Sequence, residues 1–153
     1  MKYRRLPVSE LEKLEKEFVD FLVVNGITAD DWEKLKREDP LKAEEIINQF
    51  SDVIWEGTLR KAEYITKYAQ HAVFCFQCLP DKMRLIKVTP ESEDELMYDF
   101  DDLKRAVETN KKLFVQRAEK AYQPSREREI YSMIEQGCEI TDHTLFELLD
   151  ALD

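Results

Sequence analysis

Residues 72–88, AVFCFQCLPDKMRLIKV, constrain the fold more than any other stretch of the chain. Two short apolar runs flank a turn at residues 79–82, where Pro followed by Asp suits the two central positions of a type I turn. Both faces of the first run are apolar, so we expect that strand to be central in its sheet and covered, or nearly covered, on both sides. The stretch therefore predicts a β-hairpin around which the rest of the chain packs.

Most of the remaining sequence has helical periodicity. The first helix is expected to run unbroken from Ser9 to Val24, with Ser9 and Glu12 as a capping box and Asn25-Gly26 as its end. Further helix starts are predicted at Thr28, Asp39-Pro40, Asp101 or Asp102, Pro124-Ser125 and Thr141-Asp142. The helix that starts at Asp39-Pro40 is expected to be the most apolar of the N-terminal half.

Two further segments favour extended structure. Residues 64–68 are rich in strand-forming residues and favour a short strand or extended segment, with the last turns of the preceding helix as the alternative. The segment of about 112–122 is expected to form a strand that pairs with one edge of the hairpin. The predicted fold is therefore α+β: a small antiparallel sheet, made of the hairpin of about 72–88 plus a strand of about 112–122, packed with about five or six helices. Residues 1–153 are expected to form a single globular domain.

Charge and composition narrow the class of protein. The formal net charge is −10, and 43% of residues are hydrophobic, which favours a folded, soluble chain and opposes a broad nucleic-acid or anionic-membrane surface. We expect no secretory signal and no membrane span, because no apolar run is long enough. Three cysteines without a secretory signal fit reduced thiols and a cytoplasmic location.

The cysteines are the first candidates for chemistry. His71, Cys75 and Cys78 are close in sequence, and Cys138 is distant. Residues three apart on a strand point to opposite faces, so Cys75 and Cys78 are expected to diverge rather than converge on a zinc ion. A redox pair would be expected at a helix N-terminus. We interpret these thiols as buried structural residues and predict no metal and no cofactor.

The two histidines and the acidic run are weaker candidates. His71 precedes the hairpin and His143 lies in the first turn of the last helix, and a general acid–base role is an alternative to an ordinary surface role for each. The acidic residues of 91–102 lack the spacing of a calcium loop and are expected to form a solvated connection, with docking of a basic partner as the alternative. Catalytic residues remain unassigned.

Basic residues could form one local phosphate-binding face if the N-terminus lies beside residues 111–128. The residues of this predicted face are Lys2, Arg4, Arg5, Lys111, Lys112, Arg117, Lys120, Arg126 and Arg128.

Several phrases resemble a family of small, functionally uncharacterised cytoplasmic proteins of the Bacteroidota. They are KYRRL (2–6), ITADDW (27–32), FSDVIWEGTLRKAEY (50–64), MRLIKV (83–88), KAY (120–122) and IEQGCEIT (134–141). The resemblance runs from end to end and implies a bacterial cytoplasmic protein, without implying an activity. The cysteine pair is not among the shared phrases, which argues against a metal role common to the family.

The preferred functional hypothesis is a non-catalytic protein-interaction or adaptor module. Its basis is a well-formed core without a catalytic or cofactor motif. The alternative is an RNA- or DNA-associated factor that uses the basic face around Arg4, Arg5, Arg117 and Arg126. An enzyme is the third hypothesis, and a deep polar pocket around His71 or His143 would favour it.

Overall fold

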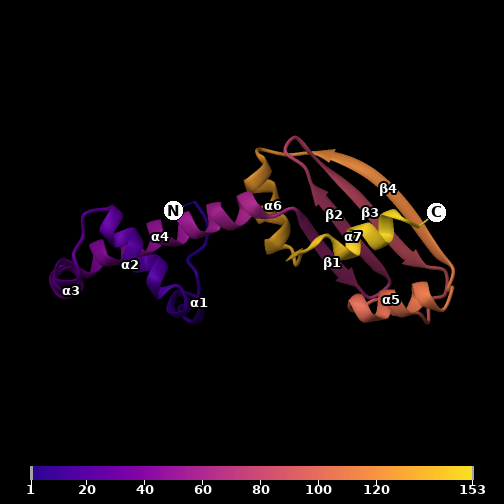
Figure 1. Cartoon of the computed structure of the whole chain (residues 1–153), viewed down its shortest axis with the longest axis horizontal. Helices are drawn as coiled ribbons and strands as arrows, with labels where there is room; N and C mark the ends of the chain where they lie inside the picture. Colours follow the sequence, from indigo (N-terminus) through magenta and orange to yellow (C-terminus); the bar gives the residue numbers. More distant parts are fainter. Residues whose placement is uncertain (1, 153) are drawn as a thin grey trace. The chain divides into compact units, whose positions relative to one another are not determined.

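The computed structural model describes residues 2–152, which form seven helices and a five-stranded antiparallel sheet (Figure 1). The α+β class predicted from the sequence is confirmed. The chain divides into two compact units, Met1–Thr58 and Leu59–Asp153, and the boundary lies within the longest helix. Each unit has its own internal packing.

The N-terminal unit is helical. Its elements are α1 (Val8–Lys13), α2 (Glu15–Val24), α3 (Ala29–Glu38) and most of α4 (Pro40–Lys61). The Phe18 ring is 5.2 Å from the Trp32 ring and 5.0 Å from the Phe50 ring, both edge-on. Such edge-to-face pairs add to the energy of apolar burial, so this aromatic group holds α2, α3 and α4 together.

Two predicted helix starts in this unit are confirmed. The Thr28 hydroxyl accepts a hydrogen bond from the Asp31 amide at 3.0 Å. The Asp31 carboxylate in turn accepts one from the Thr28 amide at 3.2 Å. This is a reciprocal capping box, which satisfies two otherwise unpaired N–H groups. Asp39 likewise accepts the Lys42 amide at 3.2 Å, with Pro40 as the first residue of α4.

The prediction of one unbroken helix from Ser9 to Val24 is wrong. Pro7, not Ser9, occupies the N-cap position, and no side chain caps α1. The helix is interrupted at Leu14, where φ is −106° and the Leu14 amide donates to Leu11 O at 3.1 Å. No Gly or Pro marks this break. Packing of Phe18 against α3 and α4 sets the direction of α2 independently of α1.

The first residues of the chain lie along α4. The Tyr3 amide donates to Asp52 at 2.9 Å, and the Trp55 indole N–H donates to Arg4 O at 3.1 Å. Ser51, which is fully buried, accepts the Leu6 amide at 3.3 Å. Two of the sequence segments that carry the family resemblance, residues 2–6 and 50–64, therefore contact each other directly.

The C-terminal unit is built on the sheet, whose strand order is β4-β3-β2-β1-β5. The strands are β1 (Tyr64–Ala69), β2 (Ala72–Cys78), β3 (Lys82–Pro90), β4 (Leu113–Ala121) and β5 (Glu139–Thr141). The hairpin, the extended segment before it and the strand after residue 112 are all confirmed, and β2 is the central strand. The sequence did not predict β5, a three-residue strand that pairs with β1.

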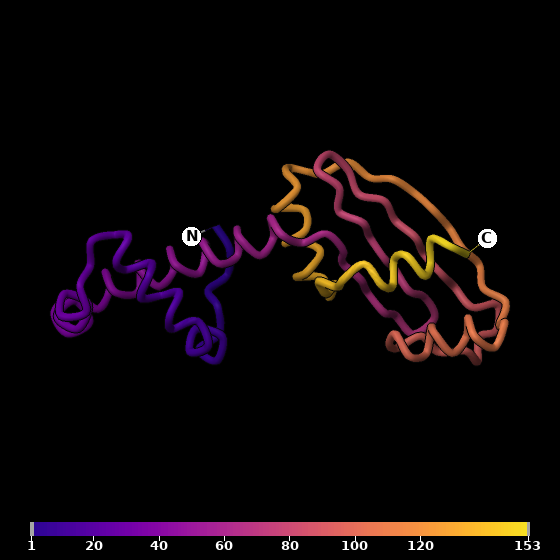
Figure 2. Tube along the Cα trace, in the orientation of Figure 1, coloured from indigo at the N-terminus to yellow at the C-terminus, as the bar shows by residue number. Residues whose placement is uncertain are grey.

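Helices α5 (Phe100–Glu108) and α7 (His143–Asp150) cover one face of the sheet, and Figure 2 shows α7 running across the strands. Their buried Leu103 and Leu149 share a core with Val73, Cys75 and Ile86 of the strands. Helix α6 (Arg126–Glu135) contacts one end of the opposite face, where Glu129 lies 2.6 Å from Lys120 of β4.

The start of α5 corrects a second prediction. Asp99, rather than Asp101 or Asp102, is the N-cap and accepts the Asp102 amide at 2.9 Å. Asp102 instead accepts the Tyr98 amide at 2.9 Å. Met97, fully buried just before the cap, anchors the segment and fixes where the helix begins. The other predicted caps, Ser125 of α6 and Asp142 of α7, are confirmed.

Candidate functional site: an apolar groove between three helices

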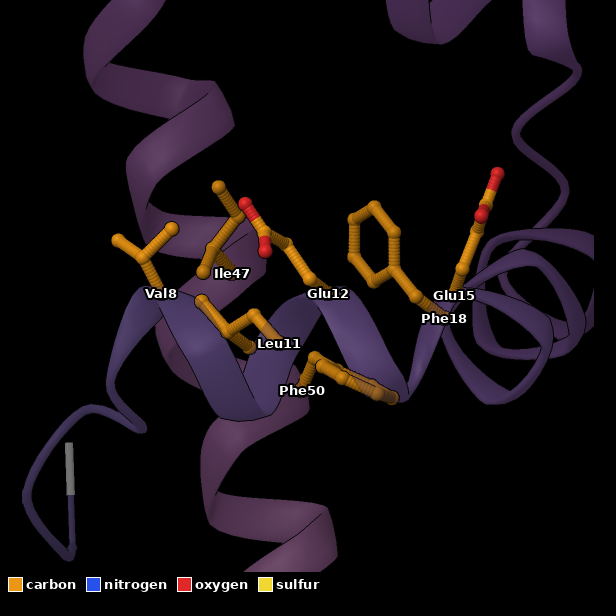
Figure 3. A pocket seen from close by; sticks show the side chains of 7 residues that line it. All are labelled: Val8, Leu11, Glu12, Glu15, Phe18, Ile47 and Phe50. Carbon is orange, nitrogen blue, oxygen red and sulfur yellow. The ribbon is translucent and has the colours of Figure 1, made fainter.

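The groove lies in the N-terminal unit, where α1 and α2 meet α4 (Figure 3). It has a volume of about 340 Å³. The side chains that line it are Val8, Leu11, Glu12, Glu15, Phe18, Ile47 and Phe50. Five of these seven are apolar, so the groove presents a hydrophobic surface to solvent.

The break at Leu14 positions the two walls of the groove. Val8 and Leu11 are three residues apart and therefore lie on one face of α1, and Ile47 and Phe50 form an equivalent pair on α4. In Figure 3 the Val8, Leu11 and Ile47 side chains lie next to one another, and the Glu12 side chain stands between them and Phe18 of α2. A straight helix from Ser9 to Val24 would have carried α1 along the axis of α2, so the groove depends on the interruption.

The rim of the groove is acidic. Glu12 and Glu15 are exposed, and no ion pair joins either carboxylate to a side chain within residues 2–152. Val8, which contributes to the apolar wall, is 70% exposed. An apolar floor beside two uncompensated carboxylates suits a ligand that has apolar side chains next to positive charge.

Comparisons with known proteins place the chain in a family. The model of a family of unknown function, DUF6495, matches residues 1–153. The chain belongs to this family. Searches of curated proteins and of solved structures find no match to it.

In this DUF6495 chain the three cysteines are free and buried. Cys75 faces the α5–α7 layer, whereas Cys78 pairs with Met83 on a row of the opposite face. Burial raises the pKa of Cys75 to about 11 and that of Cys78 to about 12, and it also raises the pKa of Cys138. Neutral thiols are poor nucleophiles and poor metal ligands. No described His, Cys, Asp or Glu side chains gather in a group of three that could hold a metal ion.

The two histidines occupy separate exposed positions. His71 lies in the turn between β1 and β2, and His143 is the first residue of α7. The imidazole Nδ1 of His143 is 3.1 Å from a carboxylate oxygen of Glu147, one helical turn later. This contact is an ordinary i, i+4 pair on a helix surface.

Residues 91–99 of the acidic run connect β3 to α5, and its last residues form the first turn of α5. Several of its carboxylates have partners within the C-terminal unit: Glu91 pairs with Lys112 at 3.6 Å, Glu95 pairs with Lys111 at 3.4 Å, and Asp99 caps α5. The segment is therefore held by several local contacts. Leu96 and Tyr98 remain 39% and 58% exposed.

At least seven of the nine basic residues singled out from the sequence have acidic or backbone partners for their side chains. Arg117 lies 2.6 Å from Asp150, and the Arg126 guanidinium is turned inward onto three backbone carbonyl groups. Other such pairs are Lys2–Glu56, Arg5–Glu44, Lys111–Glu95, Lys112–Glu91 and Lys120–Glu129. These carboxylates offset the positive charge that would attract phosphate.

No helix within residues 2–152 is both long enough and apolar enough to span a bilayer.

Proposed function

We propose that this protein is a non-catalytic interaction module whose groove between α1, α2 and α4 binds an amphipathic segment of a partner protein. The proposal rests on two features of the groove together. Its lining is apolar at Val8, Leu11 and Ile47, and its rim carries carboxylates without ion-pair partners among residues 2–152. The partner segment would insert one or two apolar side chains and place Lys or Arg beside Glu12 and Glu15.

The size of the groove limits what it can accept. A volume of about 340 Å³ suits a few side chains of a short helix or extended peptide rather than a folded domain. Because the floor is largely apolar, most of the affinity would come from burying those anchors, and the carboxylates would set the orientation and the rate of association.

The experiment is a selection of peptides from a random displayed library, followed by affinity measurements on the full chain. The selected peptides are expected to share an apolar anchor next to Lys or Arg. Val8→Asp, which places a charge in the apolar wall, should weaken their binding about tenfold or more. Val24→Asp is the matched control, because Val24 is 85% exposed and is not a lining residue of the groove.

A second pair of variants tests the rim. Glu12→Lys with Glu15→Lys should weaken binding of the same peptides and reduce its salt dependence. Glu17→Lys with Asp20→Lys reverses the same number of charges on α2 outside the lining of the groove and should have little effect. Failure to select any peptide, or equal loss with both pairs, would contradict the proposal.

Nucleic-acid binding through Arg4, Arg5, Arg117 and Arg126 is the weaker proposal. Arg5 and Arg117 are paired with carboxylates, and Arg126 points inward. Salt-dependent binding of RNA or DNA that is lost on Arg5→Gln with Arg117→Gln would favour it over the peptide groove.

We also propose a bacterial cytoplasmic location. Its support is the family resemblance and the three free thiols, which suit a reducing compartment. Cell fractionation of a native host, with thiol counting on the purified chain, tests it.

A further inference from the structure

The face of the sheet opposite α5 and α7 has an unusual composition for so acidic a chain. The β-ladder registers align Lys67, Phe74, Lys87 and Gln116 in one row across four strands. Neighbouring rows on this face contain Ile65, Phe76, Leu85 and Ala118 on one side, and Thr89 with Phe114 on the other. None of these strand residues is acidic, although the chain has 33 Asp and Glu residues.

Helix α6 contacts one end of this face near Lys120 and Cys78, and its C-cap residue Gln136 reaches Lys67. Further along the strands, Phe114 is 51% exposed and Ile140 is 42% exposed. Phe74, Leu85 and Lys87 are partly exposed in the middle of the sheet. We call the group formed by Lys67, Phe74, Leu85, Lys87, Phe114 and Gln116 the open sheet face.

The lysines of the open sheet face differ from the other basic residues of the sheet. Lys82, Arg84, Arg117 and Lys120 all form ion pairs. Within the described residues, Lys67 and Lys87 form none: Lys67 Nζ donates to Gln136 O at 3.1 Å, and Lys87 Nζ lies 5.3 Å from the centre of the Phe74 ring. Among the basic residues of the strands, the charges that no carboxylate offsets are therefore both on this face.

Charge decides what kind of molecule can cover the open sheet face. A second copy of the chain would bring its own Lys67 and Lys87 against the first pair, with no carboxylate between them. An anionic partner gains from both lysines. The exposed Phe114 ring also offers a planar apolar surface on which unpaired bases can stack.

The geometry points to a single-stranded nucleic acid bound across β1–β4, and we propose that the open sheet face binds such a strand. Phe74 and Phe114 are two strands and two residues apart, about 12 Å by ordinary sheet spacings, so they would contact different bases. Lys67 and Lys87 would contact phosphates, and Gln116 would offer hydrogen bonds to base edges or sugars. Duplexes are disfavoured, because their bases are already stacked on each other.

The test is fluorescence anisotropy with labelled single-stranded RNA and DNA of mixed sequence, and with the matching duplexes, between about 50 and 200 mM salt. The single strands should bind more tightly than the duplexes. Two neutralised phosphates predict a slope of log K against log salt of about −1.4, since each contributes about −0.7 on a single strand. Lys67→Gln with Lys87→Gln should bring that slope close to zero.

Matched controls separate the face from net charge and from general aromaticity. Lys16→Gln with Lys34→Gln removes the same charge from exposed helix positions and should leave binding unchanged. Phe114→Ala should weaken binding about tenfold, whereas Tyr98→Ala, which removes a ring that is 58% exposed in the acidic segment, should not. Circular dichroism on each variant confirms that it is folded.

Several results would overturn the proposal. They are absence of binding to every oligonucleotide, tighter binding of duplexes, and equal losses in the face variants and their controls. Displacement of the oligonucleotide by polyglutamate as effectively as by polyuridylate would assign the face to an acidic polypeptide instead. Val8→Asp in the helical groove should not alter oligonucleotide binding, so this proposal and the peptide-binding proposal can fail separately.

Discussion

The guanidinium group of Arg126 donates a hydrogen bond to the backbone carbonyl of Leu59 at 2.9 Å. The same group also donates to the carbonyl groups of Ala62 and Cys78. Carbonyls in the last turn of a helix have no partner within the helix, and here a partly buried cation supplies hydrogen bonds to them. Arg126 thus joins the end of α4, the end of β2 and the start of α6.

Replacing Arg126 by Gln should lower the free energy of unfolding by about 3 kcal/mol, because charge-assisted bonds are lost and carbonyl groups are left unpaired. The measurement is urea unfolding followed by circular dichroism. Arg60→Gln removes the same charge from an exposed position and should change the stability by less than about 0.5 kcal/mol. Equal effects of the two substitutions would show that only net charge matters.

Thr28→Ala should destabilise the chain by about 1 kcal/mol, because the capping box with Asp31 is lost. Thr28→Ser keeps the hydroxyl group and should retain most of the stability. Thermal unfolding of the three proteins under one buffer condition checks the order. A Ser variant as unstable as the Ala variant would mean that the methyl group, rather than the hydroxyl cap, supplies the energy.

Stability should fall at alkaline pH. Burial raises the pKa of Cys75 to about 11 and that of Cys78 to about 12, above the usual thiol value of 9.0. Burial also raises the pKa values of Tyr68 and Tyr122 from 10.0 to about 12. Each group is favoured in its neutral form by folding. Their contribution is therefore fully present below pH 9.0 and is lost as pH rises towards 12. Urea midpoints at a series of pH values measure the loss.

Replacing one buried thiol tests whether it contributes to this loss of stability at alkaline pH. Cys78→Ala removes one buried thiol and should make the decline shallower between pH 9.0 and about 12. The Ala variant is expected to be less stable than the parent at neutral pH because of the cavity it leaves, so the comparison uses the slope rather than the absolute stability. An unchanged slope would show that Cys78 does not contribute.

The two units are expected to unfold in one transition, as the sequence-based prediction of a single domain requires. Both tryptophans, Trp32 and Trp55, lie in Met1–Thr58, and all three cysteines lie in Leu59–Asp153. Tryptophan fluorescence therefore reports one unit, and thiol labelling at increasing urea reports the other. Coincident midpoints indicate one cooperative domain, whereas separated midpoints would indicate two.

Local signals in the sequence predicted most of the secondary structure. The caps at Thr28, Asp39 and Asp142 are side chains that bond to nearby amides, so a few consecutive residues are enough to find them. The strands of the hairpin were found from their apolar residues and the Pro-Asp turn.

The missed features depend on distant residues. The break at Leu14 has no helix-breaking residue and follows from packing of Phe18 on Trp32 and Phe50. Strand β5 is three residues long and exists through its pairing with β1. The Asp99 cap follows from burial of Met97, which no nearby sequence pattern indicated.

The sequence by itself determined the fold class, the central position of β2 and most helix starts, because these follow from periodicity and short-range hydrogen bonding. Tertiary structure decided which surfaces stay uncovered. The groove needs α1 to turn away from α2, and the open sheet face needs a register that places Lys67, Phe74 and Lys87 in one row. Contacts between residues far apart in the chain set both, and a one-residue shift in register would move that row to the other face.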